Sequence, residues 1–234
     1  MKKNMLRELF GSLSRFELGL WIFSVIAVTL SFILGTQFMV LTLIASLVGV
    51  TSLIFIAKGN VWGQVLMLIF SLLYAVISYK ERYYGEMITY VLMTAPAALM
   101  STISWLRHPF KKGINEVKVA RLNGKKIAVM LLLSVAVTAV FYYILKFFNT
   151  ANLVWSTVSI TTSFIASYLT FMRSSYYALA YAANDIILII LWVAASVATP
   201  GNTPMIACFA VFFINDMYGF FSWRSMQKKQ SKGE

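Results

Sequence analysis

The sequence predicts an all-α integral membrane protein with eight transmembrane helices, and three observations lead to this fold class. Hydrophobic residues make up 60% of the chain and charged residues only 12%, whereas soluble domains are about 45–50% apolar and about 25% charged. The apolar segments are continuous and approach the roughly 20 residues that a helix needs to cross a bilayer. A membrane barrel would alternate in segments of about ten residues instead. Basic residues, finally, gather in alternate loops.

Charged residues, glycines and prolines divide the chain into eight candidate spans. In chain order these are 18–36, 38–57, 61–79, 86–105, 127–147, 152–172, 176–198 and 204–223. The preceding segment, "MLRELFGSLSRF", is amphipathic and is expected to lie on the inner membrane surface. The first span, "LGLWIFSVIAVTLSFILG", has full length and no small-x-small site at its end, so we do not expect a cleavable signal.

The distribution of basic residues predicts the orientation of the helices. With eight spans both termini share a side, and assigning that side to the cytoplasm puts seventeen lysines and arginines inside. Only Lys80, Arg82 and Lys146 fall outside. Contact with anionic headgroups then explains the formal net charge of +12, and no soluble basic domain indicates a nucleic-acid partner. We therefore expect a lipid bilayer around the protein, both termini in the cytoplasm and no bound nucleic acid.

Two groups of three spans are expected to be an internal duplication. Each group closes its first inner turn with a basic residue, Lys58 or Arg173, and ends in an aromatic residue and arginine, "ISWLR" or "FSWR". One connecting span leaves the two groups parallel, related by an axis along the membrane normal, which is a transporter architecture. Chance similarity among multi-span proteins is the alternative.

This duplication divides the chain into five parts. They are an amphipathic segment with an extra helix (1–37), the first triad (38–107), a linker with a connecting helix (108–150), the second triad (151–225) and a cytoplasmic tail (226–234). The linker, "HPFKKGINEVKVARLNGKK", alternates apolar and basic residues, so we expect it to lie on the membrane surface.

Two Asn-Asp pairs, Asn184–Asp185 and Asn215–Asp216, are expected near the middle of the membrane. Counting from the basic residues that end their helices, they lie roughly 16 and 13 Å from the inner edge of a core about 30 Å thick. Exposing a central Asp to lipid costs about 2.5–3.5 kcal/mol, so the pairs should face the interior. They either clasp helices together or line a substrate cavity, and nearby tyrosines favour the cavity. Adjacent residues point about 100° apart, so one member of each pair should face it.

Six further residues are candidates for the same site: Tyr177, Tyr181, Gln64, Trp62, Glu86 and Tyr90. For Glu86 there is a second explanation, because an acidic residue in the first turn stabilises a helix N-terminus. Pro96 interrupts the hydrogen bonds of the same helix near its middle and is a candidate hinge.

The residues needed for several kinds of chemistry are missing from the sequence. One histidine, His108, and one cysteine, Cys208, cannot assemble a zinc or haem site. The segment "NGKKIA" lacks the glycine-rich start of a P-loop, and no nucleophile elbow occurs. We expect neither a cofactor nor an enzyme, although a membrane-embedded enzyme or an assembly protein is the alternative class.

At "AKGNVWGQ…LLYAVISYKERYYGEMITYVLMTAPAALMSTISWLRHPF" the sequence resembles the PnuC family of bacterial vitamin carriers. The resemblance covers about residues 38–226, and "YYGEMITY" and "SWLRHPF" are its most specific stretches. It implies a SWEET-like fold with a three-one-three core, to which the helix at 18–36 is an addition. It further implies a homotrimer in the bacterial cytoplasmic (inner) membrane that takes up nicotinamide riboside, an NAD precursor, by facilitated diffusion.

The resemblance also implies a binding pattern. Family members hold the substrate with two tryptophans three residues apart and an asparagine four residues later, and these positions here are Tyr177, Ala180 and Asn184. The asparagine is kept, the first aromatic is a tyrosine and the second is lost. Sister groups carry thiamine or riboflavin. A buried carboxylate at Asp185 or Asp216 suits a cation, and aromatic faces add about 0.5–2 kcal/mol. This favours nicotinamide riboside or thiamine and leaves these two open.

Overall fold

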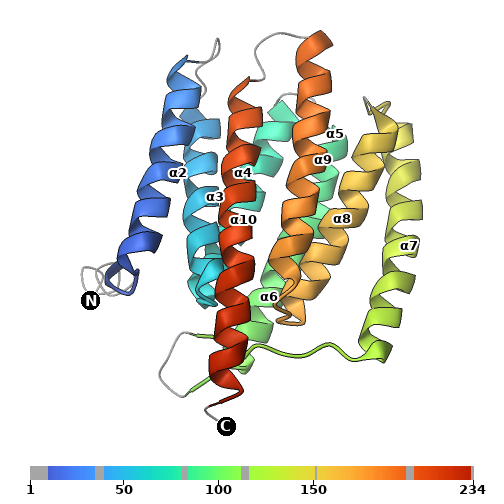
Figure 1. Ribbon diagram of the computed structural model, residues 1–234. Coiled ribbons are helices and arrows are strands. Elements are labelled where there is room, and N and C mark those ends of the chain that lie inside the picture. Colours follow the sequence, from blue (N-terminus) through green and yellow to red (C-terminus); the bar gives the residue numbers. More distant parts are fainter. Residues whose placement is uncertain are drawn as a thin grey trace.

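The computed structural model describes residues 10–34, 40–80, 84–111, 116–150, 152–198 and 203–232, and all regular secondary structure in these ranges is helical. Figure 1 shows the long helices side by side, with the start of α2 and the end of α10 at the same end of the bundle. The helices are α2 (Arg15–Leu34), α3 (Val40–Ala57), α4 (Val61–Lys80), α5 (Tyr84–Thr89), the π-helix η1 (Tyr90–Thr94), α6 (Ala95–Arg107), α7 (Gly124–Phe147), α8 (Leu153–Phe171), α9 (Tyr177–Ala198) and α10 (Thr203–Gln230).

These helices confirm the predicted fold class, since each of the eight predicted spans corresponds to a helix. Within the described ranges, seven helical segments are long and apolar enough to cross a membrane. The remaining helix, α8, is rich in serine and threonine. Hydroxyls of Thr157 and Thr170 donate to the carbonyl oxygens of Leu153 and Ala166, at 2.7 and 2.8 Å. Such bonds satisfy hydroxyl groups inside the bundle, where α8 packs between α7 and α9.

The fourth span, 86–105, contains the interruption that Pro96 predicts, shifted by one turn. Residues Tyr90–Thr94 form a π-helix, and Pro96 follows in the first turn of α6. Proline has no N–H group and its ring crowds the carbonyl four residues earlier, so the wider turn absorbs the clash without breaking the span. Tyr90 and Thr94, at the two ends of this π-helix, both face cavities inside the bundle.

The turn after α3 and the turn after α8 are built alike. Gly59 has φ of 65° and Arg173 has φ of 58°, both in the left-handed region. The N–H group of the next residue, Asn60 or Ser174, donates to a carbonyl five residues earlier at 2.9 Å. Arg173 thus corresponds to Gly59 in backbone conformation, and Lys58 stands one residue before that position in the turn of the first triad. The similar turns support the predicted duplication.

The linker between the triads binds both of these turns. The N–H group of Val117 donates to the carbonyl of Gly59 at 3.0 Å, and that of Ala120 donates to the carbonyl of Arg173 at 2.9 Å. In Figure 1 this green segment crosses the end of the bundle on its way to α7. Val117 is buried, so this part of the linker packs on the helices, where a surface position was expected. The reason is that the turns at the ends of α3 and α8 leave the carbonyl groups of Gly59 and Arg173 free to accept hydrogen bonds from the linker.

Glu17 attaches the extra helix α2 to the core. It forms a capping box with Ser14: the Ser14 N–H donates to Glu17 Oε2 at 2.6 Å, and the Glu17 N–H donates to Ser14 Oγ at 3.2 Å. Lys58 Nζ lies 3.0 Å from Glu17 Oε2, and the Tyr218 hydroxyl donates to Glu17 Oε1 at 2.9 Å. One carboxylate therefore joins α2 to the first triad at Lys58 and to the second at Tyr218.

Candidate substrate-binding cavity

A cavity of about 90 Å³ lies between the two triads, and we name it the central cavity. Its lining comes from α3, α4 and η1 of the first triad and from α8, α9 and α10 of the second. The lining residues are Leu53, Ile56, Gln64, Met67, Phe70, Tyr90, Thr94, Ser163, Ser167, Tyr177, Tyr181, Asn184, Asp185, Leu188, Phe209, Phe212 and Asp216.

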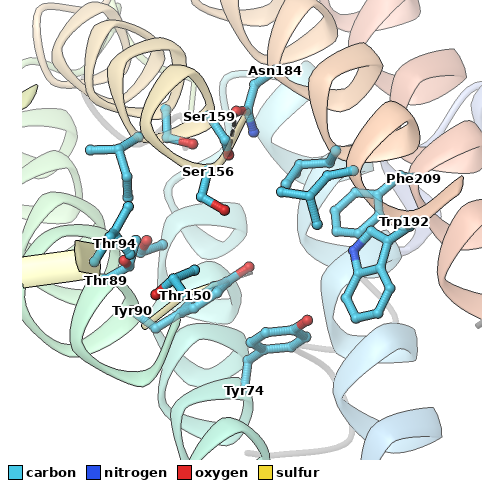
Figure 2. Close-up of a pocket in the computed structure, with 15 residues that line it drawn as sticks. Tyr74, Thr89, Tyr90, Thr94, Thr150, Ser156, Ser159, Asn184, Trp192 and Phe209 are labelled. Carbon is cyan, nitrogen blue, oxygen red and sulfur yellow. Dashed lines mark hydrogen bonds between the residues drawn. The ribbon is translucent and has the colours of Figure 1, made fainter. Parts of the chain in front are cut away.

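A second cavity of about 100 Å³, the outer cavity, adjoins the first toward the end of α7. Its polar lining, shown in Figure 2, is mostly hydroxyl groups: Tyr74, Thr89, Tyr90, Thr94, Thr150, Ser156, Ser159 and Ser163. Asn184 and Phe209 are among the residues that line both cavities. Each volume is below the about 300–1,000 Å³ of a drug-sized ligand pocket. A vitamin-sized molecule would therefore fit only when the side chains between the two cavities move.

Asn184 stands where the two cavities meet, with its amide oriented by α8. Its Oδ1 accepts hydrogen bonds from Thr162 Oγ1 at 2.7 Å and from Ser159 Oγ at 3.2 Å. Figure 2 shows the bond to Ser159, with the amide nitrogen of Asn184 turned toward the cavity. Because two hydroxyl donors occupy the oxygen, the NH₂ group remains available to donate to a ligand.

Asp185 and Asp216 meet across α9 and α10 at the wall of the central cavity. Each residue is only 4% exposed, and Asp185 Oδ2 has no hydrogen-bond partner among the described residues. Two buried carboxylates side by side repel each other, and a positive charge beside them offsets that repulsion. Beside a cavity, such a pair is suited to the positive charge of a bound molecule.

Gln64 brings a second amide to the central cavity, from α4. Its side chain is 2% exposed, and Nε2 has no hydrogen-bond partner among the described residues. Leaving a buried donor unpaired costs about 1–3 kcal/mol. Native proteins keep few such groups, and a ligand that accepts the hydrogen bond would remove the cost.

Aromatic rings form much of the remaining wall. Tyr177 is 1% exposed, and its ring packs edge-on against Trp223 with centroids 4.7 Å apart. The Tyr181 hydroxyl lies 3.1 Å from Ser167 Oγ. On the opposite side, the Tyr90 and Tyr74 ring centroids are 4.4 Å apart. The cavity can therefore place flat π-faces beside a ring-shaped guest.

Seven of the ten residues that the sequence predicted come together around the central cavity: Asn184, Asp185, Tyr177, Tyr181, Asp216, Gln64 and Tyr90. The other three do not join them. Trp62 is half-buried at the start of α4 and lines neither cavity. The side chain of Glu86 lies outside the described part of the structure.

Asn215 points away from the cavity and joins two helices instead. Its Nδ2 donates to Ser24 Oγ on α2 at 2.8 Å and to the carbonyl of Val211 at 2.9 Å. The expectation that one member of each pair faces the cavity thus holds for Asn215–Asp216. It is wrong for Asn184–Asp185, because α9 packs between α8 and α10 and cavity walls lie on both of those sides.

Several wall residues were missed from the sequence although a spacing signal was present. Phe209 and Phe212 precede Asp216 by seven and four residues, which puts all three on one helix face. Ser159, Ser163 and Ser167 recur every four residues along α8 and also face the cavities. Phe70 had no comparable signal, because it follows Gln64 by six residues, a spacing that does not put the two on one helix face.

Comparison with known proteins gives one curated relative and one solved structure that cover nearly all of the chain. The chain is 27% identical over 238 residues to the nicotinamide riboside transporter PnuC of Neisseria mucosa, covering 96% of this chain and 87% of the relative. It superposes on a crystal structure of the vitamin B3 transporter PnuC with a TM-score of 0.82, covering 97% of both chains. At 24% identity, this structural match shows the shared fold.

Family membership follows from a sequence model, which confirms the resemblance to PnuC carriers. The family described as nicotinamide mononucleotide transporter matches residues 39–225, from the start of α3 to the end of the second triad. The match leaves out α2, as expected for an added helix. With both triads, the connecting helix and the cavity between them inside the matched region, this chain belongs to the nicotinamide mononucleotide transporter family, whose members span the membrane several times and are transporters.

Proposed function

We propose that this protein carries nicotinamide riboside across the bacterial cytoplasmic membrane by facilitated diffusion, with the substrate bound in the central cavity. The observation that carries the proposal is the combination of polar groups around that one cavity. Two amides, Asn184 and Gln64, and the carboxyl pair Asp185–Asp216 converge there among aromatic rings. The name of the Neisseria mucosa relative supports the same substrate.

Each part of nicotinamide riboside has a matching group in the cavities. Its pyridinium ring is a flat cation, which suits the carboxyl pair and the faces of Tyr177 and Tyr181. Its carboxamide can accept hydrogen bonds from the free amide nitrogens of Asn184 and Gln64. Its ribose hydroxyls would meet the hydroxyl-lined outer cavity.

The charges of the lining favour the riboside over its phosphorylated form. No lysine, arginine or histidine lines either cavity in the described part of the chain. A phosphate would bring up to two negative charges next to Asp185 and Asp216 without a cation to balance them. We therefore assign nicotinamide riboside, and not the mononucleotide of the family description, as the substrate.

Thiamine is the second candidate, because it is also a cation with an aromatic ring. The carboxyl pair would serve it equally well. The unpaired Gln64 donor favours the riboside, whose carboxamide oxygen is a strong acceptor for it.

The direction and organisation of transport follow the charge pattern and the resemblance. We place both termini in the cytoplasm, in agreement with the seventeen inward basic residues. Alternating access between the triads would expose the cavity to each side in turn. The homotrimer stays a prediction.

Uptake by purified protein in liposomes tests the proposal. Labelled nicotinamide riboside should equilibrate faster than in empty vesicles, and unlabelled riboside should compete better than thiamine, with the mononucleotide weakest. The matched control is the Asn184→Ala variant, reconstituted at the same density, which should behave like empty vesicles. Equal rates with and without the parent protein would refute a carrier for this substrate, and preferential uptake of thiamine would establish the second candidate.

A further inference from the structure

Two Ser-Trp sequences, Ser104–Trp105 and Ser222–Trp223, meet at the cytoplasmic end of the bundle. They are the aromatic parts of the "ISWLR" and "FSWR" ends of the two triads. Trp105 is 2% exposed and Trp223 is fully buried, and their ring centroids are 5.3 Å apart. These are among the largest buried side chains in the described part of the structure.

The Ser-Trp sequence at the end of the second triad binds the first triad. Trp223 Nε1 donates to the carbonyl of Ile56 at 2.8 Å. The neighbouring Ser222 Oγ donates to the carbonyl of Ala57, also at 2.8 Å. Both acceptors lie in the last turn of α3, where helix carbonyls lack partners within the helix.

The Ser-Trp sequence at the end of the first triad binds the second triad in the same way. Trp105 Nε1 donates to the carbonyl of Thr170 at 3.1 Å, and Ser104 Oγ donates to the carbonyl of Phe171 at 2.9 Å. These acceptors lie in the last turn of α8. Ala57 and Phe171 both stand two residues before the left-handed residue of their turn. The two sets of bonds are therefore equivalent under the axis that relates the triads.

The paired tryptophans do not line the central cavity but pack beneath residues that do. Tyr177, which lines that cavity, rests on Trp223. Ile56, whose carbonyl accepts from Trp223, lines the cavity as well. The paired rings therefore lie next to the wall of the central cavity, at the end of the bundle that we assign to the cytoplasm.

We propose that Ser104–Trp105 and Ser222–Trp223 form a symmetric cytoplasmic gate, held shut by four hydrogen bonds that cross between the triads. This gate rests on the proposed function as a carrier. Opening requires the four carbonyls to exchange serine and tryptophan donors for water, and the contact between the rings couples the two sides. The triads can then separate at their cytoplasmic ends only when both sets of bonds break.

Accessibility of a cysteine in the cavity tests the gate without any substrate. The chain has one cysteine, so Cys208→Ala with Ser163→Cys leaves a single thiol at a position that lines both cavities. A membrane-impermeant methanethiosulfonate reagent is added to inside-out and to right-side-out vesicles. Adding Trp105→Phe and Trp223→Phe replaces each indole with a smaller phenyl ring and removes both N–H donors, so labelling from the cytoplasmic side should accelerate about fivefold or more. Labelling from the outside should not accelerate.

The controls separate the gate from general loosening and from the choice of substrate. Trp155→Phe removes an indole donor from an exposed position on α8 and should leave both labelling rates unchanged. The single variants Trp105→Phe and Trp223→Phe should give equal, smaller accelerations if the two sides are equivalent. Cytoplasmic labelling that stays at the parent rate in the double variant would overturn the gate.

A milder pair of variants covers the case in which the tryptophan variants do not fold. Ser104→Ala with Ser222→Ala removes the other two donors without touching the rings, and faster cytoplasmic labelling is again expected. An unchanged rate in a folded double-serine variant would likewise overturn the gate. Failure of nicotinamide riboside uptake would leave these labelling rates untouched, so the gate and the substrate assignment can fail independently.

Discussion

Asn184 and Asn215 show how one residue type at one depth can serve two purposes. Asn184 has its oxygen bound by α8 hydroxyls and its nitrogen turned to the cavity. The amide nitrogen of Asn215 donates to Ser24 of α2 and to a backbone carbonyl of α10, where these two helices pack together. Both are buried Asn residues followed by Asp, and only the surroundings distinguish a ligand-facing amide from one that joins helices.

We expect Asn184→Ala to abolish the stabilisation of the protein by nicotinamide riboside while changing the ligand-free melting temperature little. A ligand that binds only the folded state raises stability as its concentration exceeds Kd. Asn215→Ala should do the reverse: it should lower the ligand-free stability by about 1–3 kcal/mol and keep the ligand-induced shift. Thermal unfolding in detergent over a ligand series measures both, and loss of the shift in both variants would contradict the division of roles.

Gln64→Leu should weaken ligand binding and at the same time stabilise the ligand-free protein. The leucine removes a buried amide nitrogen that has no partner in the described structure, and leaving such a group unpaired costs about 1–3 kcal/mol. Isothermal titration with nicotinamide riboside and thermal unfolding without it would check the two effects. If Gln64 only fills space, affinity in the leucine variant will match that of the parent.

At the scale of the elements, one carboxylate contacts both triads from α2, beside the bonds that Ser24 makes with Asn215 and Trp21 makes with Thr51. Glu17 is 5% exposed. Its carboxylate accepts the capping-box bond from Ser14, forms the ion pair with Lys58 and accepts a hydrogen bond from Tyr218. Removing one partner of a buried charge pair leaves the other charge uncompensated.

We expect Glu17→Ala to destabilise the protein by several degrees, because Lys58 and Tyr218 lose their common partner. Arg15→Ala, two residues earlier on the exposed side of the same helix, is the matched control and should change the melting temperature little. Thermal unfolding of both variants in the same detergent checks the expectation. Equal melting temperatures for the two variants would mean that the other contacts of α2 hold it without Glu17.

The whole molecule has the organisation of a transporter. Two triads enclose cavities, a connecting helix joins them, and the P-loop that would indicate an ATP motor is missing from the sequence. Apolar side chains on the outer face of α7, such as Leu132 at 71% and Val135 at 70% exposure, are suited to lipid contact.

Transport by the whole protein should therefore reach equal concentrations on both sides and stop. Imposed proton or sodium gradients should leave the final level of nicotinamide riboside in liposomes unchanged, although Asp185 and Asp216 are present in the cavity wall. The measurement is the plateau of labelled substrate with and without each gradient, and a collapsing ionophore is the control. Accumulation above equilibrium that the ionophore abolishes would show ion coupling.

Much of this molecule was predictable because the membrane imposes local rules on the sequence. A span must be apolar over about 20 residues, so the number of helices and their approximate ends follow without tertiary information. The same rules pointed to seven of the ten residues that we expected at the cavity. The serines spaced four residues apart along α8 gave a further signal for the cavity wall, which is visible in their spacing but not in the composition of the chain.

Rotation of the helices about their own axes was decided only by the tertiary structure. A helix that is apolar all round carries no periodic pattern to tell lipid from protein, so packing against neighbours sets which face turns inward. That is why Asn215 joins α2 while both Asn184 and Asp185 reach the cavity, and why Arg173 matches Gly59. The sequence by itself determined which polar groups must avoid lipid; only the packed bundle decided whether each would meet a cavity or another helix, because that choice depends on contacts between residues far apart in the chain.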